Sequence, residues 1–102
     1  MAGYCAAPKP LAVEVAVRDS ISGRAAADGA SGTLVHAGIT DTLFQRDSLT
    51  LLGGSETGTY TVTIDRPGYL TWHASNIHVT VVGPCGNVIP VDLEAKLQPE
   101  IP

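Results

Sequence analysis

Residues 59–65 read Thr-Tyr-Thr-Val-Thr-Ile-Asp, so polar and apolar side chains alternate along the whole stretch. Successive side chains of a β-strand point to opposite faces, which puts Tyr60, Val62 and Ile64 together on one face. Threonine, valine and isoleucine are β-branched, and such residues suit a pleated, half-buried surface. The stretch therefore predicts a strand with one face in a core and the other in solvent.

The same alternation recurs on both sides of this strand. Further strands are expected at 11–18, 33–37, 39–45, 48–52, 76–82 and 88–97. Turn-forming glycine, proline and polar residues fill 19–24, 53–58 and 66–68 between them. Short strands that each have one apolar face and are separated by turns are typical of a β-sandwich. We predict an all-β, antiparallel Greek-key β-sandwich of about seven strands, a single domain over 1–102 with its core in 10–98.

Large apolar side chains are expected to fill the middle of the sandwich. Tyr69, Leu70 and Trp72 follow the turn at 66–68 and are assigned to this centre. Ile89 is expected to face inward on the last strand. Pro90 lies on the polar face of that strand, which predicts an edge strand or a bulge there.

Composition excludes several classes of protein. The 102-residue chain has a formal net charge of −4, with 44% hydrophobic and 16% charged residues. Its negative charge offers no electrostatic basis for binding nucleic acid or an anionic membrane. The high apolar content argues against disorder. No apolar run approaches the ~18 residues that span a bilayer, so direct membrane insertion is not expected.

The two cysteines, Cys5 and Cys85, precede the first and the last expected strands. A bridge between them would close a loop of about 80 residues and contribute roughly 4.5 kcal/mol in the chain-entropy model. Two reduced thiols are the alternative, and the spacing alone leaves both open. The chain has no Cys-x-x-Cys motif, which argues against a thioredoxin-like or cysteine–zinc site.

The three histidines are His36, His73 and His78. His73 and His78 are close in sequence, and together with Asp41 they would make a minimal metal site. The alternative is that all three are solvent-facing residues on strand surfaces. We adopt the second interpretation and predict no metal site and no cofactor.

Catalytic and aromatic binding sites have little support in the sequence. The chain has no Gly-x-Ser-x-Gly nucleophile elbow, and no catalytic residues are predicted. Tyr4, Tyr60, Tyr69 and Trp72 could form a platform on which carbohydrate stacks. Tyr60 and Tyr69 fall on the inward-facing side of the alternating pattern, which instead favours packing in the core. Phe44 is expected to be buried as well.

Residues 58–69 read Gly-Thr-Tyr-Thr-Val-Thr-Ile-Asp-Arg-Pro-Gly-Tyr. This run resembles the Gly-x-Tyr-x-Val-x-Val…Pro-Gly-Tyr signature of carboxypeptidase regulatory-like domains, which are transthyretin-like β-sandwiches. Residues 15–25 and 72–97 resemble the opening and closing parts of the same family. The resemblance implies a Cys5–Cys85 disulfide, because small bacterial members have an early cysteine and another before the last strand. It also implies an accessory module without chemistry of its own, periplasmic or lipid-anchored.

One branch of the transthyretin-like proteins is enzymatic, the 5-hydroxyisourate hydrolases, and the chain resembles it near 17–26. Those enzymes have a histidine in the first strand and end in Tyr-Arg-Gly-Ser. Here the first strand has Val15 and Val17, and the sequence ends Gln-Pro-Glu-Ile-Pro. These differences argue against the hydrolase.

The leading functional hypothesis is therefore a non-catalytic exported module that acts structurally or through protein contacts at a bacterial envelope. The second is binding of carbohydrate or another small ligand by loops such as 53–58 and 67–72. Open sheet edges offer a further route to contact with other chains. The expected location is extracytoplasmic, whether periplasmic, secreted or lipid-anchored, and the expected partners are a protein or a surface glycan.

Overall fold

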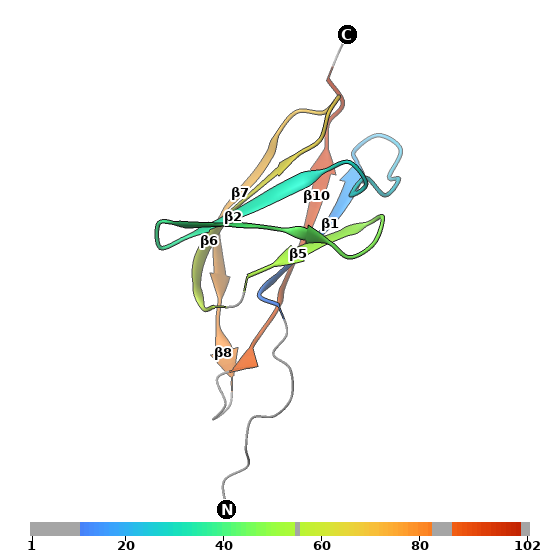
Figure 1. Cartoon of the computed structure of the whole chain (residues 1–102). Coiled ribbons are helices and arrows are strands. Elements are labelled where there is room, and N and C mark those ends of the chain that lie inside the picture. The colour runs from blue at the N-terminus through green and yellow to red at the C-terminus, as the bar shows by residue number, and fades with distance from the viewer. Residues whose placement is uncertain (1–10, 55, 83–86, 101–102) are drawn as a thin grey trace, which may run out of the picture.

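Two four-stranded sheets and one two-stranded sheet form the fold (Figure 1). The computed structural model describes residues 11–54, 56–82 and 87–100, and all regular structure within them is β. The strands are β1 (Val13–Asp19), β2 (Ser31–His36), β3 (Ile39–Thr42), β4 (Phe44–Gln45), β5 (Thr50–Gly53), β6 (Gly58–Asp65), β7 (Trp72–Val79), β8 (Val81–Val82), β9 (Asn87–Val88) and β10 (Val91–Leu97). The β1 sheet has the order β10-β1-β5-β4, and the β6 sheet has the order β3-β2-β6-β7. The all-β class and a sandwich-like arrangement are confirmed, with ten short strands in these ranges where about seven were expected.

Strand β1 lies inside its sheet, between β5 and β10. It pairs antiparallel with β5 but parallel with β10, so that Val13 faces Val91 and Asp19 faces Leu97. The prediction of fully antiparallel sheets was therefore wrong at this pair. Side chains alternate with the same period in parallel and antiparallel strands, so alternation carries no information about strand direction.

The core lies between the inner faces of the two sheets. Strand β6 contributes Tyr60, Val62 and Ile64, none more than 2% exposed, which confirms the inward face predicted for it. The buried side chains of the β1 sheet that join the same cluster are Val13, Val15, Val17, Leu51, Ala95 and Leu97. Burying each valine, leucine or isoleucine contributes roughly 1.5–3 kcal/mol.

The expected strand 39–45 is two strands, because the chain changes sheets at Leu43. Strand β3 pairs with β2 in the β6 sheet, and β4 pairs with β5 in the β1 sheet. Leu43 is buried where Gly32 and Gly53 leave room: a Cβ on these glycines would lie 2.5 Å and 2.9 Å from Leu43 methyl carbons. Phe44 follows and is 54% exposed, so the prediction that it is buried was wrong.

Tyr69, Leu70 and Trp72 lie at the margin of the core and not at its centre. Tyr69 and Trp72 are half-buried and pack against the core cluster, whereas Leu70 is 52% exposed. The predicted central position was wrong because Tyr69 and Leu70 lie in the connection between β6 and β7, outside the layered strands, and Trp72 is the first residue of β7. This places an indole and an apolar side chain near the surface.

The last two expected strands are each interrupted. Strand β7 ends at Val79, and the expected strand 88–97 is divided at Ile89 and Pro90. The Ile89 N–H donates to the Thr80 carbonyl at 2.9 Å, and the Ile89 side chain is 45% exposed, contrary to its predicted inward position. Pro90 has no N–H to pair. The break there, and the edge position of β10, confirm the prediction made from Pro90.

Each side of the sandwich is formed by one edge of each sheet. On one side, β3 and β4 are joined by the single residue Leu43. On the other, the segments next to β7 and β10 are bridged: Tyr69 pairs with Pro99, and the Leu70 N–H donates to the Gln98 carbonyl at 2.8 Å. Figure 1 shows the β6–β7 connection meeting the end of β10 near the C-terminus. The β3 side has no such bridge among the described residues.

Candidate functional site

His73 and His78 both face solvent, as predicted, but they are not neighbours. The Nδ1 atom of His73 lies 3.2 Å from the Thr63 hydroxyl opposite it. The Nδ1 atom of His78 lies 3.1 Å from the Thr59 hydroxyl. Four positions on β6 separate these partners, or about 13 Å along a strand, and Asp41 is at the opposite edge of the sheet. The described residues contain no group of three histidine, cysteine or acidic side chains that could hold a metal.

His36 is half-buried, which corrects the expectation that all three histidines face solvent. Its ring stacks on Tyr60, with centroids 4.8 Å apart and planes inclined by 20°. Gly58 makes this position available. A Cβ at Gly58 would lie 2.1 Å from His36 Nε2, and the φ of +139° there is one that residues with side chains rarely adopt.

A pocket of about 240 Å³ opens beside this ring, and we call it the β3 pocket. Its lining residues are His36, Ile39, Asp41, Glu56 and Tyr60. The Tyr60 hydroxyl donates to the Glu56 carbonyl at 2.8 Å and so ties Glu56, shortly before β6, to the core. Neither Asp41 nor Glu56 forms an ion pair with a cationic side chain in the described ranges. The pocket therefore presents two uncompensated carboxylates beside an exposed isoleucine.

Among the described residues, the side chains of the β3 pocket form no hydrogen-bonded pair of a nucleophile or base with its partner. A nucleophile or general base works through a hydrogen bond to its partner. Within the described residues, no hydrogen bond joins His36 to either carboxylate or to the Tyr60 hydroxyl, which is engaged with the Glu56 backbone.

Strand β3 forms the rim of the pocket and an edge of the β6 sheet. All four of its residues are exposed, with Ile39 at 59%. Ala37 and Gly38 connect it to β2 with φ angles of 52° and 78°, the two positive values that a type I′ hairpin turn requires. This turn fixes the register in which Ile39 faces His36.

Some backbone N–H and C=O groups of β3 are unpaired, and the pattern of hydrogen bonds between β2 and β3 shows which. The Leu43 N–H donates to the Gly32 carbonyl at 2.8 Å, so the pair of Leu34 and Asp41 two positions further along is also hydrogen-bonded. Thr40 and Thr42 alternate with these residues. Their N–H and C=O groups point away from β2, where no described strand pairs with them.

A second pocket, the Trp72 cleft, lies between the start of β7 and the end of β10, near the Tyr69–Pro99 bridge. It has a volume of about 220 Å³ and is lined by Leu70, Thr71, Trp72, His73, Lys96 and Gln98. A half-buried indole beside hydroxyl, amide and ammonium groups can stack against an apolar ring and hydrogen-bond to its substituents. The segment 67–72, which the second functional hypothesis assigned to ligand binding, contributes three residues to this cleft.

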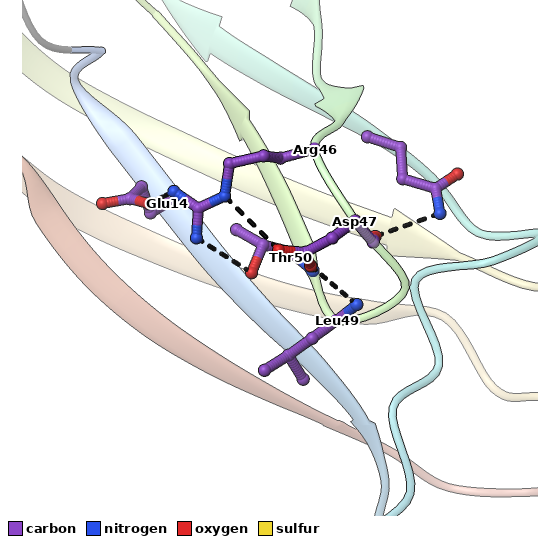
Figure 2. A network of polar contacts seen from close by, with 6 residues as sticks. Glu14, Arg46, Asp47, Leu49 and Thr50 are labelled. Atoms are coloured by element: carbon purple, nitrogen blue, oxygen red, sulfur yellow. Dashed lines mark hydrogen bonds and ion pairs between the residues drawn. The ribbon is translucent and has the colours of Figure 1, made fainter.

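A third polar site, on the β1 sheet, is occupied by the chain's own side chains (Figure 2). The Arg46 guanidinium pairs with Glu14 at 2.5 Å and donates to the Thr50 hydroxyl at 3.4 Å. Asp47 accepts hydrogen bonds from the N–H groups of Leu49 at 2.9 Å and Thr50 at 2.8 Å, and these bonds lower the pKa of its carboxyl. This network holds the turn before β5 against β1, and the charges of Arg46, Glu14 and Asp47 are paired within it.

Comparisons with known proteins add no relative. No family model matches the chain, and no curated protein is significantly similar to it. Cys5 and Cys85, the predicted disulfide, lie outside the described residues, as does Tyr4. No helix long and apolar enough to cross a membrane occurs in the described part of the chain.

Sequence reasoning named His36, Asp41 and Tyr60 in separate hypotheses and did not place them together. The signal that could have done so is Ala37-Gly38 between two alternating runs, which marks a two-residue hairpin turn. That turn would have put Ile39 and Asp41 on the same face as His36. Glu56 and Gly58 come from a separate loop, and no local pattern connects them to the hairpin.

Proposed function

We propose that the chain is a non-catalytic β-sandwich module that acts by binding another protein, and that β3 with its pocket is the contact surface. The observation that carries this proposal is an edge strand with four exposed residues, an exposed isoleucine and two residues whose backbone groups are unpaired. Exposed edges of this kind accept a strand from another chain. On the opposite side of the sandwich, the bridge between Tyr69 and Pro99 joins the two sheets instead.

Photo-cross-linking from defined positions tests this proposal in the producing cells. A photo-reactive phenylalanine at position 39 should give cross-linked protein adducts, and the same residue at exposed position 75 on β7 should not. Thr40→Pro should abolish the adducts, because it removes an outward N–H without touching the β2–β3 hydrogen bonds. Adducts that form equally from position 75, or that survive Thr40→Pro, would contradict the proposal.

We also propose carboxypeptidase regulatory-like membership with a Greek-key, transthyretin-like topology, an extracytoplasmic location at a bacterial envelope, and a Cys5–Cys85 disulfide. The run 58–69 supports this, since Tyr60 lies in the core and the Pro-Gly-Tyr turn joins the sheets. Thiol titration of unfolded, unreduced protein should find no reactive cysteine. Two reactive thiols would remove the main support for export.

A second candidate function is binding of a carbohydrate or another small polar ligand in the Trp72 cleft. It is favoured by the half-buried indole next to Lys96 and Gln98. Trp72 is the single tryptophan of the chain, so its fluorescence reports on this cleft alone. Saturable quenching by sugars, weakened in Gln98→Ala, would support the site, and unchanged emission at millimolar sugar would argue against it.

A further inference from the structure

We infer that the partner bound at β3 presents an extended segment with a basic side chain two positions from an apolar one. This inference rests on the proposed function and adds the chemistry of the partner to it. The segment would extend the β6 sheet beside β3, and its lysine or arginine would meet the carboxylates of the β3 pocket.

Backbone geometry sets where the side chains of such a segment lie. Hydrogen bonds to Thr40 and Thr42 place an incoming residue directly opposite Asp41, in a non-hydrogen-bonded pair where side chains approach most closely. A residue two positions away lies opposite Ile39, on the same face. Both of these incoming side chains face the pocket, whereas their neighbours lie beside the threonines on the outer face.

Charge determines which side chain is favoured opposite Asp41. Asp41 and Glu56 both line the pocket, and no described cation pairs with either. Three basic side chains of the described residues pair with other acids: Arg46 with Glu14, and Arg18 and Lys96 with Glu94. A basic residue opposite an acidic one stabilises a strand pair, and a like charge destabilises it.

The same rule disfavours a second copy of this chain as the occupant. An antiparallel pair of two β3 strands that uses Thr40 and Thr42 of both copies puts Asp41 directly opposite Asp41 of the other copy. Two carboxylates at that separation repel each other. Ile39, 59% exposed beside them, favours an apolar side chain at the alternate position.

The experiment titrates the full chain with two matched peptides and follows the backbone amide resonances of β3. One peptide contains Thr-Lys-Thr-Ile, and the other replaces the lysine with glutamate. The lysine peptide should bind at least about fivefold more tightly at low salt. Asp41→Asn should reduce this preference, and Asp92→Asn, which removes the same charge from β10, should leave it unchanged. Thr40→Pro should abolish binding of both peptides, with Thr42→Pro as the alternative if that variant does not fold.

The possible outcomes separate this inference from the proposed function. Equal affinity for both peptides, lost in Thr40→Pro, overturns the basic partner and leaves edge binding intact. Binding that Thr40→Pro and Thr42→Pro do not affect, or no binding at millimolar peptide, overturns both. Sedimentation that shows a dimer of the wild-type chain, dissociated by Thr40→Pro, identifies a second copy as the occupant and also overturns the inference.

Discussion

The Tyr69 hydroxyl donates a hydrogen bond of 2.6 Å to Asp19 Oδ2, joining residues 50 positions apart. Asp19 ends β1, and its other carboxylate oxygen accepts from the N–H groups of Ile21 and Ser22 at 2.7 Å and 2.8 Å. The Arg66 guanidinium lies over the Tyr69 ring, 5.0 Å from its centroid. The Pro-Gly-Tyr turn therefore joins the β6–β7 connection to the turn after β1, and its role in this chain is structural.

Tyr69→Phe is predicted to lower the melting temperature. The substitution keeps the ring under Arg66 and beside the core but removes the donor to Asp19. Tyr69→Ala should lower the melting temperature further, because it also removes the packing of the ring. Thermal unfolding followed by circular dichroism measures both, and a Tyr69→Phe variant as stable as the wild type would show that the hydrogen bond contributes nothing.

The stability of the protein is predicted to fall in acid through Asp19. The Tyr69 hydrogen bond, followed by those from Ser22 and Ile21, lowers the pKa of Asp19 from 3.8 to about 2. The folded state therefore holds the proton less tightly than the unfolded chain does. The resulting stabilisation is complete above about pH 5 and is lost as pH falls through 4 toward 2.

Urea unfolding midpoints between pH 2 and pH 6 check this dependence. Tyr69→Phe should flatten the decline below about pH 4, because the largest cause of the pKa shift is gone. Some decline should remain, since backbone hydrogen bonds also lower the pKa of Asp47. Wild-type and variant curves that stay parallel over this range would assign the acid sensitivity to other groups.

Gly58→Ala is predicted to destabilise the protein by about 1–3 kcal/mol from backbone strain and steric conflict. The added Cβ would meet His36 Nε2 at 2.1 Å, and the φ of +139° would be strained for any side chain. His36→Ala removes the steric conflict but not the strain. The double variant should therefore be more stable than the sum of the single changes predicts, by about 0.5–3 kcal/mol. Additive effects in chemical unfolding would mean that His36 and Gly58 are not in contact.

The sequence predicted elements whose information is local and missed those that depend on distant residues. The alternation over 59–65 placed Tyr60 and Val62 in the core, as observed. The sheet change at Leu43 depends on the absence of side chains at Gly32 and Gly53, on two other strands, and a single-strand pattern does not contain this. The β3 pocket also depends on residues that are distant in sequence, because the β2–β3 hairpin supplies one wall and the loop before β6 supplies the other.

Leu43 and Phe44 provide a direct test of the sheet change, since they are consecutive and both apolar. Leu43 is 5% exposed in the core cluster, so Leu43→Ala should cost about 2–5 kcal/mol through lost burial and a cavity. Phe44 is 54% exposed, so Phe44→Ala should cost about 0.5 kcal/mol or less. Chemical denaturation of the two variants measures the difference. A single strand over 39–45 with Phe44 facing inward predicts instead that Phe44→Ala costs more stability than Leu43→Ala. That result would rule out the crossing of the chain between sheets at Leu43.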